Sequence, residues 1–429
     1  MDIKVAYGHS EKIAKLTGGR IVDIMQPKRG RVITELEHVI TAALKKPLGQ
    51  APLKQRIKPT DKLVIIIDDQ TRPTPTKIML KPILALIKGQ GVPAHHVTIV
   101  IATGAHKKLS YQEINELLGP EIVSTYHIEN HDPIAKKGLV DLGKTSFGTP
   151  LLLNKKVYQA DLRILTGMIK PHNQAGYSGG GKSILPGVCG LATILANHSY
   201  RYVSHPNSGL GLINGNPIRA DIEEVLPKLG DTTMVNVVLN YQEEVIDLVV
   251  GDAIKAHRAG VRSLDKIARM EVTERSEICI CGTPAPVDIN FYQMLNSISA
   301  PYRVKDPVIK PGATIIVAGS AGQGVSDGDF YEVMSNTERE VIWQELIKDD
   351  AKYSERAALQ IYLEGEQKYR ISVVSEEKHR QLFVKMGINY YPELQPALDE
   401  TIKQYTDHSH HPNIIVLPYA PFVIPVLNQ

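Results

Sequence analysis

The stretch GMIKPHNQAGYSGGGKSILPG, at residues 167–187, holds the densest group of residues that could do chemistry. From Gly176 to Ser183 it satisfies G-x-x-x-x-G-K-S, the pattern of a phosphate-binding loop. That loop needs a strand directly before it and a helix that opens at its lysine. Here the expected strand ends well upstream, and Pro186-Gly187 falls where the first helical turn would form. A nucleotide-dependent phosphotransferase is therefore the weaker interpretation.

The glycines of this stretch still indicate an anion-binding turn. Consecutive glycines let backbone N–H groups approach a ligand closely, and a lysine is presented beside them. The candidate residues for this contact are Ser178, Gly179, Gly180 and Lys182.

Three histidines add a second chemical signal. His106 follows the strand-ending ATG, His172 opens the glycine stretch, and His198 lies further on in LATILANHSYRYVSHP. Histidine can both give and take a proton near neutral pH. A histidine pair on opposite sides of a substrate would suit a racemase, because either mirror-image face must be attacked. Each histidine alone is more often structural, and the sequence does not show that His106 and His172 face each other.

An acid and an arginine stand at the end of another predicted strand. Asp68 and Asp69 end it, and the following TRPTP turn presents Arg72. A guanidinium there suits bidentate capture of a carboxylate or a phosphate. The alternative is a helix N-cap, in which Asp69 or Thr71 bonds the first amides of the next helix. Both interpretations can hold together.

The elements that must position these residues alternate between short β-branched runs and helical patterns, which is typical of parallel α/β sheets. The pattern predicts a first set of strands at residues 61–68, 96–104, 121–128 and 161–167. It predicts a second set at 277–282, 313–319 and 369–375, with helices at 333–348 and 354–364.

We therefore expect an α/β fold of two α/β domains with largely parallel, Rossmann-like sheets. A charged stretch near 265–275 separates the two strand sets and places the domains at 1–270 and 271–429. Ligands in such folds bind where loops leave the carboxyl ends of the strands. The first domain would carry the cofactor and catalytic motifs, and the second would close the substrate pocket over a cleft between them.

Composition narrows the class of function. The chain has 49 Lys and Arg against 46 Asp and Glu, and a formal charge of +3 argues against a dedicated nucleic-acid binder. Its start does not read as a secretory signal, and no apolar run is long enough for a membrane span. Three cysteines cannot form a disulfide framework. We expect a cytoplasmic protein.

The chain contains, in order, DDQTRPTP, ATGAHK, PHNQAGYSGGGKSILPG, NHSYRYVSHP with GNPIRADI, and DINFYQ, over roughly residues 60–300. Together these blocks closely resemble the nickel-dependent lactate racemase family. IIVAGSAGQG and IIVLPYAP echo the family more weakly beyond them. Several blocks in one order make this match far more specific than the phosphate-loop pattern.

The resemblance implies a nickel-pincer nucleotide, a pyridinium-3-thioamide-5-thiocarboxylate mononucleotide that holds nickel through two sulfurs and a ring carbon. Lys182 would be tethered to it, and His198 would bind nickel; sulfur donors with one imidazole suit square-planar nickel. His106 and His172 would be the alternating acid and base. Other residues implied at the site are Asp69 and Arg72 in catalysis, Thr71, Ser178, Gly179 and Gly180 beside the cofactor, and Arg72, Tyr292, Gln293, Asn296 and Tyr353 at the substrate.

The implied activity is inversion of C2 of a 2-hydroxyacid by reversible hydride transfer through a 2-keto acid. Deprotonating the weakly acidic C2–H directly would be hard, whereas hydride loss gives a planar centre that can be reduced on either face. The implied partners are the small-molecule substrate and the separate proteins that synthesise the cofactor. No nucleic acid or membrane partner is expected.

Two departures from the family bear on the substrate. The lactate enzymes place a lysine three residues after the glutamine, where this chain has Asn296, and their active-site tryptophan aligns loosely with Tyr353. Both changes offer hydrogen bonds without charge. We therefore expect a larger or polyhydroxylated acid, such as a sugar acid. A lactate racemase proper and a non-catalytic hydroxyacid-binding homologue are the alternatives.

Overall fold

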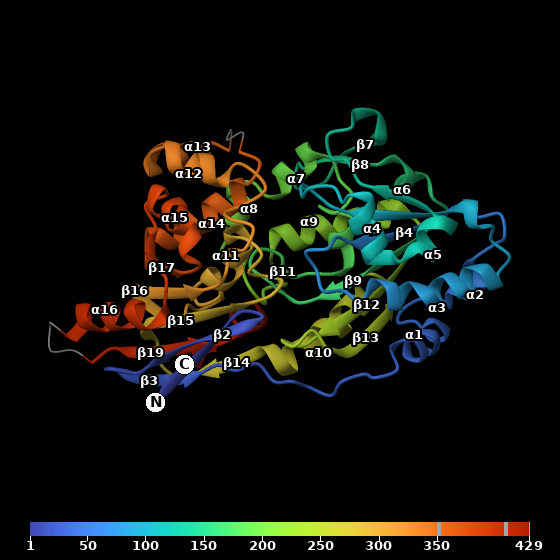
Figure 1. Cartoon of the computed structure of the whole chain (residues 1–429). Helices are drawn as coiled ribbons and strands as arrows, with labels where there is room; N and C mark the ends of the chain where they lie inside the picture. The colour runs from blue at the N-terminus through green and yellow to red at the C-terminus, as the bar shows by residue number, and fades with distance from the viewer. Residues whose placement is uncertain (350–352, 407–410, 429) are drawn as a thin grey trace.

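The computed structural model describes residues 1–349, 353–406 and 411–428 (Figure 1). Its strands form two large sheets that are mainly parallel, and helices pack on both (Figure 1). The expected α/β fold with two domains and largely parallel sheets is confirmed.

The first sheet has six strands in the order β13-β12-β9-β4-β5-β6, and only β12 and β13 are antiparallel. The strands are β4 (Leu63–Asp68), β5 (Val97–Ala102), β6 (His127–Asn130), β9 (Leu162–Ile169), β12 (Thr232–Leu239) and β13 (Val245–Gly251). Both faces are covered, so β4 and β9 are nearly continuous apolar runs. One face packs on α1 (Leu36–Lys45) and α3 (Thr76–Gly89), the other on α10 (Lys255–Ala268).

Two expected elements differ from the structure. The strand predicted at 121–128 is wrong in its first part, because α5 occupies Pro120–Thr125 and only β6 is extended. Pro120 stands at the first helical position, where its fixed φ and missing N–H favour a helix start. The helix predicted at 333–348 is divided into α12 (Phe330–Asn336) and α13 (Arg339–Ile347).

The second sheet has eight strands, ordered β18-β17-β16-β15-β1-β2, with β19 beside β15 and β3 beside β19. They are β1 (Asp2–Gly8), β2 (Ser10–Lys15), β3 (Arg20–Ile24), β15 (Ser276–Pro284), β16 (Ile309–Ala318), β17 (Arg370–Val374), β18 (Asn389–Tyr391) and β19 (Asn413–Leu417). The first three strands therefore lie with the C-terminal ones. The boundary at 270/271 remains a prediction, and it does not describe the membership of these N-terminal strands.

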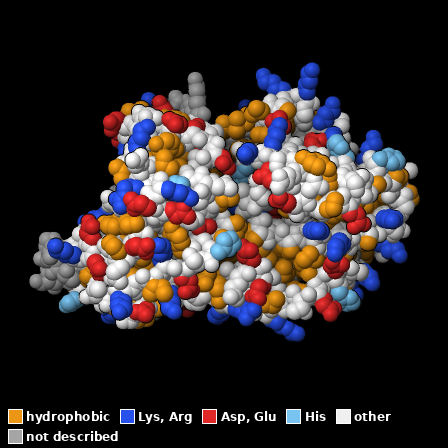
Figure 2. All heavy atoms as spheres, viewed as in Figure 1, with side chains coloured by type: hydrophobic (Ala, Val, Ile, Leu, Met, Phe, Trp, Pro, Cys, Tyr) orange, Lys and Arg blue, Asp and Glu red, His pale blue; other side chains and the backbone are white. Residues whose placement is uncertain are grey.

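The surface charge and the helices relate to the expectations about nucleic acid and about membranes. The face drawn in Figure 2 carries acidic and basic side chains intermixed, without a broad patch of one charge. Within the described ranges, none of the helices combines the length and the apolar character that crossing a membrane requires.

Candidate active site

A cavity lies between the two domains, at the carboxyl ends of β4, β5 and β9. Its walls come from the loops after these strands, from the glycine-rich stretch, and from α11 (Phe291–Ser299) and the start of α14 (Arg356–Glu366). Most of the site residues expected from the sequence line it, namely Asp69, Arg72, His106, His172, Ser178, Gly179, Lys182, His198, Tyr292, Gln293 and Asn296. The fold thus brings separate motifs together in one place.

Asp69 and His106 form a hydrogen-bonded pair in the cavity. His106 Nδ1–H donates to Asp69 Oδ2 at 2.7 Å, and the Thr71 amide donates to Asp69 Oδ1 at 2.9 Å. Burial acts to raise the pKa of the Asp69 carboxyl, but His106 and Arg72 outweigh it and hold that pKa well below its usual range. Asp69 therefore stays ionised, orients the His106 ring and leaves Nε2 free to accept a proton.

The N-cap alternative for Asp69 and Thr71 is not realised. Helix α3 begins at Thr76 after Pro75, and no side chain caps it. The carboxylate instead closes its own turn and binds the histidine.

His172 lies in a short hairpin of β10 (Pro171–His172) and β11 (Gly176–Tyr177). The amides of Gln174 and Ala175 donate to its Nδ1 at 3.2 and 3.3 Å. Burial, followed by the nearby charges of Lys182 and Arg72, lowers the pKa of His172 well below its usual value. The ring is therefore neutral, and the two amides favour the tautomer with its proton on Nε2.

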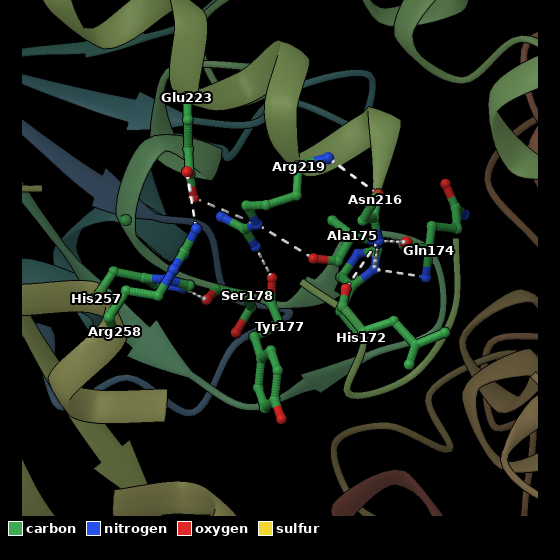
Figure 3. A network of polar contacts seen from close by, with 12 residues as sticks. His172, Gln174, Ala175, Tyr177, Ser178, Asn216, Arg219, Glu223, His257 and Arg258 are labelled. Atoms are coloured by element: carbon green, nitrogen blue, oxygen red, sulfur yellow. Dashed lines mark hydrogen bonds and ion pairs between the residues drawn. The ribbon is translucent and has the colours of Figure 1, made fainter. Parts of the chain in front are cut away.

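Three side chains hold the backbone of the glycine-rich stretch: Asn216 and Arg219 at the start of α9 (Pro217–Val225), and His257 on α10 (Figure 3). Their donor atoms lie 2.7, 3.2 and 2.9 Å, in that order, from the carbonyl oxygens of Gln174, Ala175 and Ser178. All three side chains are buried, so their bonds are shielded from water. The segment that carries the candidate catalytic groups is thus fixed through its own carbonyls.

The same stretch lacks the context of a phosphate-binding loop. Gly180–Ser183 is a single 3-10 turn, and the next helix, α7 (Leu191–Asn197), begins several residues later. The lysine is therefore not directly followed by a helix N-terminus that could bind a phosphate. Nothing in this geometry favours the phosphotransferase interpretation.

Lys182 and His198 face the same cavity. Burial, with the charges of Arg219 and Arg72, lowers the pKa of Lys182 to about 7, so a neutral amine is available near neutral pH. Burial and the Lys182 charge lower the pKa of His198 to about 3. His198 Nδ1–H donates to the Ile194 carbonyl at 3.0 Å, which leaves Nε2 as the free ring nitrogen.

These two side chains fit a tethered metal cofactor. A histidine that binds a metal through one nitrogen commonly donates its other N–H to a carbonyl or a carboxylate, as His198 does. Across the described residues, no cluster of three or more His, Cys, Asp or Glu side chains could hold a metal ion. A nickel ion here would need further ligands from a cofactor, and Lys182 offers an amine to attach one.

Helix α11 brings uncharged polar groups to the wall through Tyr292, Gln293 and Asn296. Burial raises the pKa of Tyr292 to about 12, so its hydroxyl is neutral. Asn296 Nδ2 donates to the Gln293 backbone carbonyl at 2.8 Å. The Asn296 Oδ1 atom takes no part in this bond and can accept a hydrogen bond from a ligand. These groups can bind hydroxyls of a ligand in a cavity that also holds Arg72.

Three expected residues do not line the cavity. Thr71 acts through its bonds to the neighbouring acid. The Gly180 amide donates to Asn236 Oδ1 at 2.8 Å, which makes it part of the support of the turn. The Tyr353 hydroxyl donates to the Glu345 carboxylate, so the structure does not bring Tyr353 to the cavity wall.

Sequence reasoning missed other lining residues, among them Lys170, Gln174 and Arg356. Lys170 directly follows a strand that ends at the site, which was the one available signal. Arg356 comes from the second domain, where no motif marks it, and its Nε donates to the His198 carbonyl at 3.4 Å.

The lactate racemase of Thermoanaerobacterium thermosaccharolyticum is 31% identical to this chain over 332 residues, 77% of each protein. The lactate racemase N-terminal domain matches residues 7–211, and the lactate racemase C-terminal domain matches residues 272–424. The chain belongs to the lactate racemase family. The lactate racemase of Lactiplantibacillus plantarum is 27% identical over 386 residues, 89% of each protein.

The fold agrees with membership of the lactate racemase family. The structure of the T. thermosaccharolyticum lactate racemase apoprotein matches with a TM-score of 0.89 at 26% identity, covering 99% of this chain and 100% of that one. As a member of the family, the protein is an isomerase of the racemase type.

Proposed function

We propose that the protein inverts C2 of a 2-hydroxyacid with a nickel-pincer nucleotide that is tethered to Lys182 and bound through His198. The strongest support is that Lys182 and His198 share one cavity with two further histidines. These two are His106 and His172, and their Nδ1 atoms have different hydrogen-bond partners. When bound, the nucleotide would supply the hydride acceptor that turns the hydroxyacid into a planar keto acid.

Two groups of the chain suit the substrate's carboxylate and hydroxyl. Arg72 is the candidate for the carboxylate, because a guanidinium binds that group in a bidentate manner. His106 is the candidate base for the hydroxyl proton, since Asp69 holds its Nδ1 and its Nε2 is free. After the transfer, the Asp69 charge stabilises the imidazolium.

His172 would serve the other enantiomer. Its neutral ring can donate a hydrogen bond from Nε2, but a base must offer a free Nε2. The ring must then move its proton to Nδ1 and give up the amides of Gln174 and Ala175. At 3.2 and 3.3 Å these two contacts lie at the long end of the range of hydrogen-bond distances.

A substrate deuterated at C2 tests the hydride route in the cofactor-loaded enzyme. We expect the inverted product to keep most of its deuterium, because a hydride leaves carbon and returns to it without exchanging with water. Abstraction of a proton would replace deuterium by solvent hydrogen. Mass spectrometry of the product after partial conversion separates the two routes, and wash-out at the rate of inversion would contradict the proposal.

The substrate is proposed to be a larger or polyhydroxylated acid, because Asn296 and its neighbours on α11 offer hydrogen bonds without charge. Asn296→Lys places an ammonium group on this wall. We expect it to raise kcat/KM for lactate relative to a sugar acid by about tenfold or more, the scale of a charged hydrogen bond. An unchanged ratio between the two substrates would count against the substrate proposal, and a wild type that prefers lactate would favour a lactate racemase proper.

A further inference from the structure

Lys170 is a buried lysine in the cavity that the proposed mechanism does not use. It directly follows β9, only 3% of its surface is exposed, and it lines the cavity. Within the described part of the chain, its ammonium group forms no hydrogen bond and no ion pair. Buried ammonium groups are normally paired, because removing the charge from water is costly.

The charges around Lys170 do not pair with it. Burial and the neighbouring Arg72 lower the pKa of Lys170 to about 7, while Asp68 and Glu243 act more weakly in the opposite direction. Burial also raises the pKa of the Asp68 carboxyl to about 6, so this acid gives up part of its charge near neutral pH.

Asp68 and Asp69, the two acids at the end of β4, already have hydrogen-bond partners of their own. Thr74 Oγ1 donates to Asp68 Oδ2 at 2.7 Å, and His106 occupies Asp69 Oδ2 at 2.7 Å. Lys170 and Arg72 therefore both line this cavity, and neither forms an ion pair with a carboxylate of the described residues.

We propose that Lys170 and Arg72 together bind an oxyanion, a carboxylate or a phosphate, in this cavity. An anion between the two cations would be their counter-ion and would accept charge-assisted hydrogen bonds from both. The inference rests on the proposed function, which brings both kinds of group: the 2-hydroxyacid carries a carboxylate, and the nucleotide carries a phosphate.

The position of Lys170 also bears on how a substrate would lie. Lys170 stands at the end of β9 in the first domain, whereas α11 of the second domain adds only uncharged side chains to the wall. A substrate with its carboxylate toward β9 would have its further hydroxyls near Gln293 and Asn296. A polyhydroxylated 2-hydroxyacid matches both ends of this arrangement.

Anion binding by the full-length apoprotein tests the proposal without relying on catalysis. Calorimetry would compare the wild type with Lys170→Met, using gluconate as the carboxylate probe and nicotinamide mononucleotide, which has no carboxylate, as the phosphate probe. Gluconamide is the uncharged control, and Lys228→Met, at an exposed position, is the matched variant. We expect Lys170→Met to weaken one or both anions by about tenfold or more, with gluconamide binding unchanged.

The two probes identify the source of the oxyanion. Weakening confined to gluconate assigns the substrate carboxylate, and weakening confined to the mononucleotide assigns the phosphate. Lys170→Arg keeps the charge and should keep most of the binding. Lys170→Met should also melt at a higher temperature than the wild type, because it removes an unpaired buried charge, whereas loss of a structural lysine would lower the melting temperature.

Two results would overturn the inference: a wild type that binds neither probe, or a Lys170→Met variant that binds both as tightly as Lys228→Met does. If binding depends on Lys170 but the loaded enzyme inverts no 2-hydroxyacid, the proposed function fails and the anion site stands.

Discussion

Hydrogen bonds to the protein decide which ring nitrogen each histidine of the site offers to a ligand. His106 gives Nδ1–H to a carboxylate and His198 gives Nδ1–H to a helix carbonyl, so both have Nε2 free. His172 instead accepts backbone amides at Nδ1. The sequence predicted these three residues, but not their orientations, because the partners come from the local path of the backbone and from another strand. Lys170 was missed for a related reason: its place directly after a strand is visible in the sequence, but its burial in the cavity is not.

The contribution of Asp69 can be measured by Asp69→Asn, which keeps the shape of the side chain and removes its charge. We expect kcat to fall by about 10²–10⁴-fold, the scale of general acid–base catalysis, with a smaller change in KM. Asp69 would act through His106, so in a His106→Gln background the same substitution should have little further effect. Fully additive losses in kcat would show that Asp69 acts independently of the histidine.

At the scale of elements, the glycine-rich stretch is shaped by close contacts rather than by helix formation. Gly179 has φ +77°, and a Cβ there would lie 2.7 Å from Asn236 Oδ1. The pattern G-x-x-x-x-G-K-S predicted a turn at an anion site and left its conformation open, because the side chains that hold it, such as Arg219 and His257, are distant in sequence. The strands before it were predictable from their continuous apolar runs. The strand prediction at 121–128 was wrong because it relied on the β-branched residues and not on Pro120, which starts α5.

Gly179→Ala tests this tight packing against a matched control. Gly143 has nearly the same φ, +79°, but a Cβ there would meet nothing within 4 Å. Both substitutions carry the strain of a positive φ, and only Gly179→Ala also pushes on Asn236 and its bond to the turn. We expect Gly179→Ala to lower the free energy of unfolding by at least about 1 kcal/mol more than Gly143→Ala does. Equal losses in urea unfolding would show that the turn tolerates the added methyl group.

At the scale of the whole molecule, both domains build the site and are bonded to each other beside it. Arg303, after α11, donates to the carbonyls of Asn173, Val203 and Ser208 at 2.9, 2.7 and 2.9 Å. Strands β1–β3 extend the sheet of the C-terminal domain. The domain boundary at 270/271 was predicted from a local change in the sequence pattern. Pairing between strands from the two ends of the chain produces no such local change. The meeting of motifs at one sheet edge was predictable, because parallel strands present their carboxyl ends together.

At this scale we propose that the protein works with a nickel cofactor attached to Lys182. The most direct test is the intact mass of protein produced together with the cofactor-synthesis proteins, with nickel measured on the same sample. We predict an added mass of nucleotide size that maps to Lys182, close to one nickel per chain, and loss of the added mass in Lys182→Ala. An unmodified, nickel-free chain under conditions that load another lactate racemase would contradict this proposal.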